Sequence, residues 1–221
     1  MNATDGTVER ALDSISRRLG YRSSQRYRTR AEFVFDGISL DGARVLDVGC
    51  GPGAFTLWSA LMGADYVLGI EPETDGATSG TRAELDRTVK EFELDERVET
   101  RPSLLHELTA ADGQFDVVVT YNVVNHLDED AVQRLPGDPE AEKRYRAIFS
   151  HIARLMKPGG TLVIGDCARS NAWGDRGKSS PFASMIEWDK HLDPDNWTSM
   201  LVQSGFEFMD LRWSYLYPFK R

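Results

Sequence analysis

The sequence predicts a doubly wound α/β fold, in which a mostly parallel sheet carries helices on both faces. Apolar runs of strand length alternate with helix-length amphipathic segments along most of the 221 residues. A glycine-rich turn, Gly49 to Gly53, lies between the first apolar run and the helix that follows it. The next run ends on Glu71, 22 positions after Gly49. A strand, a glycine-rich turn, a helix and an acid at this distance are typical of folds that bind a nucleotide-like ligand.

Composition indicates a single globular domain spanning residues 1–221. Hydrophobic residues make up 41% of the chain and charged residues 28%, which is ordinary for such a domain. We expect no membrane association, because no apolar run has transmembrane length and the N-terminus lacks a signal-peptide pattern. The two cysteines, Cys50 and Cys167, form no disulfide framework, so we expect a reduced, cytoplasmic protein. The net charge of −9 makes a nucleic-acid partner unlikely.

Apolar spacing predicts two helices before the first strand, at residues 7–19 and 23–37. Residues 1–40 carry seven arginines against five acidic residues, whereas the whole chain is acidic. We expect this segment to form a helical cap over the ligand site, where it would meet an anionic acceptor. The alternative is that its arginines lie on a solvated face of helices that pack against the sheet.

The remaining elements alternate as a doubly wound fold requires. The predicted strands lie at residues 43–48, 66–71, 98–101 (a brief one), 115–121, 161–164 and, as a short last strand, 206–211. Helical patterns between them occupy residues 54–62, 81–92, 140–156 and 193–203. Residues 167–192 form a polar insertion with aromatic side chains after the fifth predicted strand.

The glycine-rich turn carries an acid, Asp47, two residues before its first glycine. The spacing from Gly49 is GxGxG, and not the GxGxxG of dinucleotide-binding folds. A carboxylate at a strand tip repels a pyrophosphate, but it suits a ligand that carries an ammonium group. This stretch resembles motif I of the class I S-adenosylmethionine-dependent methyltransferases, in which the acid and the glycine loop wrap the methionine part of the cofactor.

Three later segments extend this resemblance. Residues 115–121 look like motif IV, residues 122–127 resemble the segment between cofactor and acceptor in small-molecule methyltransferases, and residues 157–160 (KPGG) precede an apolar strand, as in this family. The resemblance covers residues 43–211. It implies a Rossmann-like methyltransferase sheet of six or seven strands with the N-terminal helices as a cap. Only residues 213–221 remain for a seventh strand.

Ligands of such sheets bind beyond the carboxyl ends of the strands, near the switch in strand order. The resemblance implies that S-adenosyl-L-methionine binds to residues at the ends of the first four predicted strands: Asp47, Gly49, Cys50, Gly51, Gly53, Phe55, Glu71, Pro72, Ser103, Leu104, Asn122 and Val123. Glu71 would hold the ribose hydroxyls. The family often has an acid near Ser103, so here a main-chain amide would take its place.

The residues expected on the acceptor side come from the N-terminal helices, the end of the fourth strand and the insertion: Tyr21, Tyr27, Asn125, His126, Asp166, Glu187 and His191. His126 is the predicted general base, because the unperturbed histidine pKa lies near neutrality; the alternative is a packing or hydrogen-bonding role. Glu187 and His191 would share a face if their segment is helical. No Cys/His spacing typical of a metal site occurs, so we expect no metal.

We therefore predict a methyltransferase that moves a methyl group from S-adenosyl-L-methionine to an O or N atom of a small-molecule acceptor. One alternative is an RNA or protein methyltransferase that uses the arginines between residues 17 and 30. Another is a non-catalytic S-adenosylmethionine-binding subunit or sensor. A nicotinamide-dependent dehydrogenase is disfavoured by the GxGxG spacing and by Asp47. Oligomer formation is left open.

Overall fold

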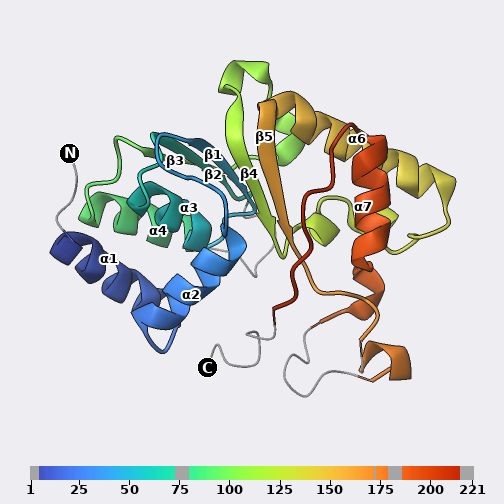
Figure 1. The fold of residues 1–221 in the computed structure, drawn as a ribbon, viewed down its shortest axis with the longest axis horizontal. Helices are drawn as coiled ribbons and strands as arrows, with labels where there is room; N and C mark the ends of the chain where they lie inside the picture. The colour runs from blue at the N-terminus through green and yellow to red at the C-terminus, as the bar shows by residue number, and fades with distance from the viewer. Residues whose placement is uncertain (1–4, 73–79, 172, 179–185, 215–221) are drawn as a thin grey trace.

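A five-stranded parallel sheet lies at the centre of the computed structural model, which describes residues 5–72, 80–171, 173–178 and 186–214 (Figure 1). The strands follow the order β3-β2-β1-β4-β5. Their bounds are β1 Arg44–Val48, β2 Tyr66–Ile70, β3 Val98–Arg101, β4 Phe115–Tyr121 and β5 Met156–Gly165. The order reverses between β1 and β4, so the predicted doubly wound α/β fold is confirmed.

The central strands β1, β2 and β4 are buried along most of their length because helices cover both faces of the sheet. Val45 and Leu46 are neighbours on β1 and face opposite sides, yet both are fully buried. Asp47 pairs in register with Gly69 on β2 and with Val119 on β4. The carboxyl ends of these three strands therefore meet at one edge of the sheet.

Four helices cover one face of the sheet (Figure 1): α1 (Asp5–Arg18), α2 (Ser24–Val34), α3 (Ala54–Leu61) and α4 (Thr81–Glu91). Leu12 and Ile15 on α1 are fully buried and share one core with Val67 and Val117 of the sheet. The two N-terminal helices form close to their predicted positions and pack on the α3–α4 layer. Their role as a cap over a site stays a prediction.

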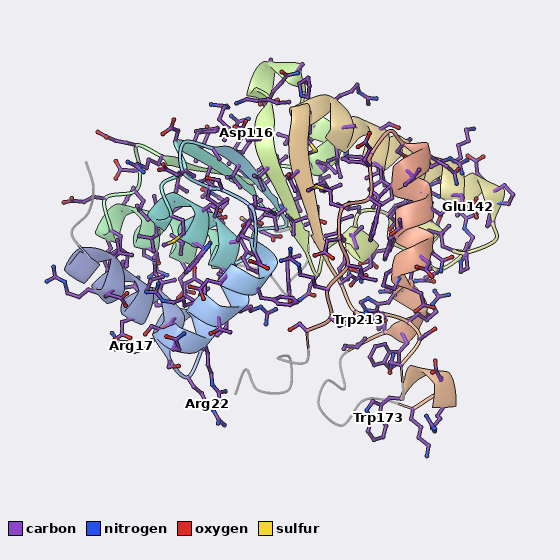
Figure 2. All side chains as sticks on the ribbon, viewed as in Figure 1. Arg17, Arg22, Asp116, Glu142, Trp173 and Trp213 are labelled. Atoms are coloured by element: carbon purple, nitrogen blue, oxygen red, sulfur yellow. The ribbon has the colours of Figure 1, made fainter. Side chains whose placement is uncertain are left out.

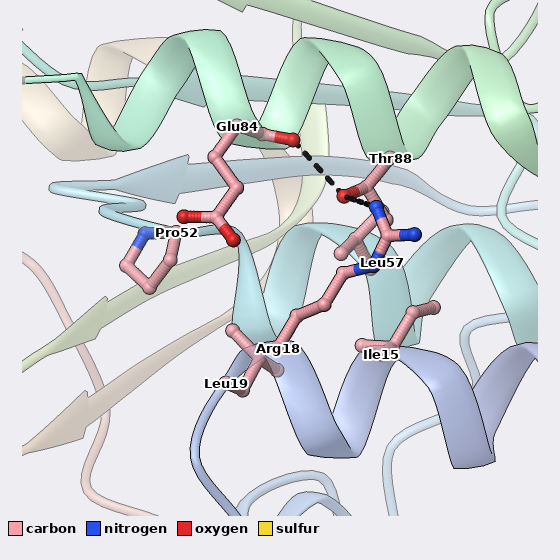
Figure 3. A pocket seen from close by; sticks show the side chains of 7 residues that line it. All are labelled: Ile15, Arg18, Leu19, Pro52, Leu57, Glu84 and Thr88. Carbon is pink, nitrogen blue, oxygen red and sulfur yellow. Dashed lines mark hydrogen bonds between the residues drawn. The ribbon is translucent and has the colours of Figure 1, made fainter.

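Arg18 links α1 to α4 behind the glycine-rich turn. Its Nη1 donates to Oγ1 of Thr88 across 3.1 Å, and its Nη2 binds Glu91. A small pocket lies beside this contact (Figure 3), lined by Ile15, Arg18, Leu19, Pro52, Leu57, Glu84 and Thr88. None of the predicted site residues lines this pocket, and we assign it to the packing of α1 against α3 and α4.

The opposite face carries α5 (Glu129–Val132), α6 (Pro139–Leu155) and α7 (Pro194–Gln203) (Figure 1). Trp197 on α7 packs against Tyr145 and Phe149 of α6, with ring centroids 5.2 and 6.1 Å apart. Single 3-10 turns lie in the loops: η1 (Leu105–Glu107), η2 (Ala110–Asp112), η3 (Val124–His126), η4 (Gly174–Arg176) and η5 (Trp188–Lys190). None of the described helices combines the length and apolar character needed to cross a membrane.

The sheet has five strands among the described residues, and the prediction of six or seven was wrong. Residues 206–211, predicted as the sixth strand, are irregular, and so are residues 213–214. The rest of the predicted seventh strand, residues 215–221, lies outside the described residues. Within the described part of the chain, β5 is therefore an edge strand, half-buried over residues 160–165.

A turn and an ion pair direct the segment after α7 away from the position of a sixth strand. The chain turns at Gly205, which has a φ of 95°. Nη1 of Arg212 then lies 2.9 Å from Oδ2 of Asp36, which follows α2. Between these points, Phe208 and Met209 are 57% and 79% exposed, so this segment gains little of the apolar burial that would stabilise a further strand.

Candidate functional site

The glycine-rich turn after β1 leaves one stretch of backbone open. Gly49, Gly51 and Gly53 all have positive φ, at 66°, 49° and 84°. A Cβ on Gly49 would lie 2.4 Å from Cγ2 of Val123, and one on Gly53 would lie 2.3 Å from Cδ1 of Leu85. A Cβ on Gly51 would meet nothing within 4 Å among the described residues. The fold itself requires the first and third glycines, whereas the space at Gly51 suits the close approach of a ligand.

Asp47 supplies a buried carboxylate beneath this turn. Its side chain accepts hydrogen bonds from the hydroxyl and the amide of Thr56, and the hydroxyl lies 2.7 Å away. Burial raises the pKa of Asp47 to about 7, and the nearby negative charge of Glu71 acts in the same direction. A cationic ligand group would compensate this carboxylate, as the sequence-based hypothesis of an ammonium ligand requires.

Glu71 lies directly beyond β2 and faces the same turn. The amide of Gly51 donates to its Oε2 across 3.0 Å, and the residue is only 7% exposed. Pro72 follows and is half-buried. Cys50 between the glycines is buried, and burial raises the pKa of its thiol well above the usual range. We therefore expect Cys50 to act through its backbone and not as a nucleophile.

The loops after β3 and β4 extend the same edge. Ser103 and Leu104 follow β3, and Leu104 is 40% exposed. Asn122, directly beyond β4, has a φ of 55° and donates its amide to the carbonyl of Gly165 across 2.7 Å. Because Val123 also packs on Gly49, the loop after β4 contacts both the turn after β1 and the last residue of β5.

Phe55, Tyr21 and Tyr27 lie in the core instead of lining an open surface. Phe55 is buried and its ring centroid lies 4.9 Å from that of Tyr121. Tyr27 is fully buried and donates its hydroxyl to the carbonyl of Ala54 across 2.6 Å. Tyr21 is also buried, with its ring centroid 5.3 Å from that of Tyr27. The structure therefore gives these three side chains a packing role.

His126 lies on η3, after β4, with its side chain 46% exposed. Its Nδ1 is 2.7 Å from Oε1 of Glu129, which also binds Nζ of Lys190 across 3.1 Å. The hydrogen bonds from His126 and Lys190 lower the pKa of Glu129. Lys190 in turn pairs with Glu187 at 2.8 Å, so Glu187 belongs to a surface ion-pair network.

Asp166 and His191 form a second histidine–carboxylate pair, which is buried. Asp166 is the first residue beyond β5, and its Oδ1 lies 2.9 Å from Nδ1 of His191. The two side chains are only 6% and 11% exposed. The amide of Cys167 also donates to Oδ1, across 2.8 Å. The condition under which Glu187 and His191 would share a helix face is not met, because only the 3-10 turn η5 forms in this stretch.

Arg169 holds the insertion against the body of the protein. Its guanidinium donates to the carbonyls of Trp188, Leu135 and Asp189 at 3.3, 3.0 and 2.6 Å. One residue later, the amide and hydroxyl of Ser170 donate to the carboxylate of Asp193 at 2.8 and 2.6 Å. These bonds close the insertion at its base and fix the segment that carries His191.

Arg30 was not predicted as a site residue, although it is one of the arginines between residues 17 and 30. Its guanidinium carbon lies 4.7 Å from the ring centroid of Tyr121, the last residue of β4. Its Nε is enclosed and has no hydrogen-bond partner among the described residues. A cation at the carboxyl end of β4 is therefore available to an anionic ligand group.

The other N-terminal arginines do not form one basic surface. Arg18 binds Thr88 and Glu91, and Arg28 binds Glu9. Figure 2 shows Arg22 extending from the turn between α1 and α2, away from the sheet. Among the described residues, no group of three or more His, Cys, Asp or Glu side chains is placed to hold a metal ion.

A family model described as a methyltransferase domain matches residues 15–211. The chain belongs to this methyltransferase family. The matched range includes the glycine-rich turn, the Asp166–His191 pair and all five strands, so the resemblance stated from the motifs is confirmed.

Curated methyltransferases are similar to most of the chain. The ubiquinone biosynthesis O-methyltransferase of Azorhizobium caulinodans is 28% identical over 172 residues, or 78% of this chain and 62% of that protein. Phosphoethanolamine N-methyltransferase 1 of Triticum aestivum is 28% identical over 192 residues, or 85% of this chain and 33% of that protein. The chain thus spans less than two thirds of the length of either relative.

Solved structures show the same fold. The cyclase SpnF aligns with a TM-score of 0.60 at 22% identity, over 86% of this chain and 59% of that one. The magnesium protoporphyrin IX methyltransferase ChlM of Synechocystis PCC 6803, solved with bound SAM, aligns with a TM-score of 0.52 at 18% identity, over 84% and 70%. Because one of these neighbours is a cyclase, the fold alone does not assign the reaction.

Proposed function

We propose that this methyltransferase-family chain transfers a methyl group from S-adenosyl-L-methionine to an O or N atom of a small-molecule acceptor. The observation that carries the proposal is the open backbone at Gly51, flanked by the buried carboxylates of Asp47 and Glu71. A ligand there meets open backbone and negative charge together. A cationic sulfonium nucleoside fits this arrangement, whereas a pyrophosphate does not.

Each part of the cofactor has a counterpart among these residues. Asp47 would compensate the ammonium group, and Glu71 would accept hydrogen bonds from the ribose hydroxyls. Arg30 would bind the methionine carboxylate, because its guanidinium lies at the end of β4 and its Nε has no hydrogen-bond partner among the described residues. Ser103 and Leu104 would lie along the adenine, and Asn122 and Val123 would complete the edge toward the acceptor.

When bound, the cofactor would supply a methyl group on an already activated sulfonium leaving group. The contribution of the chain is then to align the acceptor atom with the methyl–sulfur axis and to exclude water. The loops after β4 and β5 and the insertion provide polar side chains that could align the acceptor: Asn125, His126, Asp166 and His191. Glu187 and the buried Tyr21 and Tyr27 would act indirectly, through the ion-pair network and the core.

The proposal also includes a cytoplasmic location and a small-molecule partner. Both cysteines are free thiols, which supports the predicted cytoplasmic location. The dispersed arginines of α1 and α2 do not favour the RNA or protein methyltransferase alternative over a small-molecule acceptor.

Calorimetric titration with S-adenosylmethionine and S-adenosylhomocysteine, with NAD as the control ligand, tests the cofactor assignment. We expect binding of both sulfur ligands and none of NAD. Release of S-adenosylhomocysteine in the presence of an acceptor then distinguishes an enzyme from a sensor. If neither sulfur ligand binds, the cofactor assignment is wrong.

A further inference from the structure

The Asp166–His191 pair orients the imidazole and favours one of its neutral tautomers. Oδ1 of Asp166 faces Nδ1 of His191 at 2.9 Å and also accepts the amide of Cys167. A carboxylate in this position favours the neutral tautomer with its proton on Nδ1. The lone pair of a neutral imidazole is then on Nε2, at the far side of the ring from Asp166.

Nε2 of His191 is available to a ligand. No described residue makes a hydrogen bond to it, and it is not among the fully enclosed polar atoms that lack a partner. Trp188 packs near the ring, with centroids 6.2 Å apart. The histidine is therefore held by a carboxylate on one side and by packing on the other, while its acceptor nitrogen has no partner from the described chain.

Two enclosed oxygens in the neighbouring loops also lack partners among the described residues. Oδ2 of Asp166 has none, although the side chain is only 6% exposed. Oδ1 of Asn125, on η3, has none, and that residue is 2% exposed. An unsatisfied buried acceptor is costly, so both oxygens suit a ligand that brings hydrogen-bond donors.

The pair lies on the acceptor side of the sheet edge. Asp166 follows β5, and the bond from the Asn122 amide to the Gly165 carbonyl joins its loop to the end of β4. The residues proposed to bind the cofactor lie mainly after β1 and β2, on the other side of β4. An acceptor between the cofactor and β5 would thus meet His191 and Asp166.

We propose that His191 is the general base of this methyltransferase, that Asp166 is the residue that positions it, and that the acceptor is a hydroxyl compound with a second hydrogen-bond donor. This inference rests on the proposed methyl transfer. Nε2 takes the proton of the acceptor hydroxyl while the oxygen forms a bond to the methyl carbon. The carbon–sulfur bond breaks, and its electron pair stays on sulfur as the neutral thioether.

The total charge is the same before and after this step. The sulfonium loses its positive charge as the imidazole gains one, and the carboxylate of Asp166 stabilises the imidazolium until its proton passes to water. A second donor on the acceptor, such as the adjacent hydroxyl of a catechol, would satisfy Oδ2 of Asp166. Amines that are neutral when bound need no such base.

His126, the base predicted from sequence, is the competing candidate. Its ring is 46% exposed, and its Nδ1 faces Glu129, which Lys190 also binds. Water competes for hydrogen bonds at so exposed a ring, and the pair has no enclosed oxygen without a partner. These differences favour His191, and the test includes both histidines.

The kinetic test compares His191→Gln, Asp166→Asn, His126→Gln and the control His151→Gln with the wild type. Catechol, 4-nitrocatechol and ethanolamine serve as acceptor probes between pH 7 and 10. For catechol near pH 7, we expect His191→Gln to reduce kcat/KM about 100-fold and Asp166→Asn to reduce it by at least tenfold. S-adenosylmethionine binding should remain unchanged. His151, which is bonded to the carbonyl of Leu105, should tolerate glutamine without this loss.

The base is dispensable once the acceptor ionises by itself. We therefore expect the deficit of His191→Gln to shrink for the more acidic 4-nitrocatechol, and for catechol as the pH approaches about 10. A structural role for His191 would give a loss that is independent of acceptor acidity and pH. That outcome, or a loss carried by His126→Gln alone, overturns the inference.

Nitrogen-15 NMR of the histidine rings gives a readout that needs no turnover. The chain has four histidines, so the glutamine variants assign the signals. We expect His191 to carry its proton on Nδ1 in the wild type and to lose this preference in Asp166→Asn. A proton on Nε2 in the wild type overturns the inference, as does turnover of ethanolamine without turnover of either catechol. Failure to bind S-adenosylmethionine instead contradicts the proposed function itself.

Discussion

The amide of Gly51 donates a hydrogen bond to Oε2 of Glu71 across 3.0 Å. This bond joins the turn after β1 to the first residue beyond β2, so two loops that are distant in sequence form one surface without a ligand. Such preorganisation lowers the entropy lost when a ligand binds. Oε1 of Glu71 has no partner among the described residues and remains for the ribose hydroxyls.

Glu71→Gln tests the assignment of this carboxylate to the ribose. Glutamine retains an acceptor for Gly51 but loses the charge that strengthens hydrogen bonds to the hydroxyls. With each charge-assisted bond contributing about 1.5–3 kcal/mol, we expect the affinity for S-adenosylmethionine to fall roughly 10- to 100-fold in calorimetric titration. Glu187→Gln, at the surface ion pair with Lys190, is the matched control. Equal affinities of the two variants would contradict the assignment.

Gly51 and Gly49 should respond differently to alanine. At Gly51 the added Cβ has free space, so Gly51→Ala should destabilise the fold by only about 1 kcal/mol through its positive φ, but should block the cofactor. At Gly49 the Cβ would lie 2.4 Å from Val123, and overpacking should cost about 1–3 kcal/mol in addition. Urea unfolding and calorimetric titration measure the two effects. Unchanged cofactor binding by Gly51→Ala would contradict the proposal that the cofactor lies against the backbone at Gly51.

Asp47→Asn should make the free energy of unfolding less sensitive to pH. The folded-state pKa of about 7 lies above the reference value of 3.8, so the native protein binds the proton more tightly and loses stability as pH rises between these values. At 1.36 kcal/mol per pKa unit, the loss is on the order of 4 kcal/mol by pH 8. Asp47→Asn should therefore exceed the wild type in stability at pH 8, with the gap closing toward pH 4. Urea unfolding across this range provides the measurement.

The same carboxylate should make cofactor affinity depend on pH. If ionised Asp47 compensates the ammonium group, wild-type affinity for S-adenosylmethionine should rise with pH up to about 7 and then level off. Asp47→Asn should bind more weakly and without this slope. A wild-type affinity that is flat between pH 5 and 8 would exclude Asp47 from the binding equilibrium.

Tyr27→Phe separates a packing role from a role in acceptor binding. The change removes the hydroxyl that donates to the carbonyl of Ala54 across 2.6 Å in a fully buried setting. We expect a loss of about 1 kcal/mol or slightly more in unfolding free energy, because the carbonyl is left unsatisfied. The KM for an acceptor should not change. A selective rise in that KM would restore the sequence-based prediction that Tyr27 contacts the acceptor.

The cofactor half of the site could be predicted because its signals are local. Asp47, the three glycines and the first turn of α3 belong to one strand–turn–helix unit, and Glu71 ends the next strand. The fold class follows from the same alternation of elements. Thr56, the hydrogen-bond donor to Asp47, was missed because a threonine inside an apolar helix gives no signal of its own.

The acceptor half depends on contacts between distant parts of the chain. Asp166 and His191 are 25 residues apart and meet only because the bonds of Arg169 and Ser170 fold the insertion back. Residues 206–211 were predicted to form a strand, but strand formation also needs a partner strand and burial that the local sequence does not specify. Tyr27 was predicted to contact the acceptor from the cap. In the structure its side chain is fully buried, because α2 packs on the layer of helices that covers the sheet.

The bond between Ser170 and Asp193 has an evolutionary consequence. Because this bond brings the two ends of the intervening segment together, the length of that segment can change at little entropic cost to the rest of the fold. Recombination or insertion within this stretch of a gene can then yield descendants that modify new metabolites while they inherit the ancestral methyl donor.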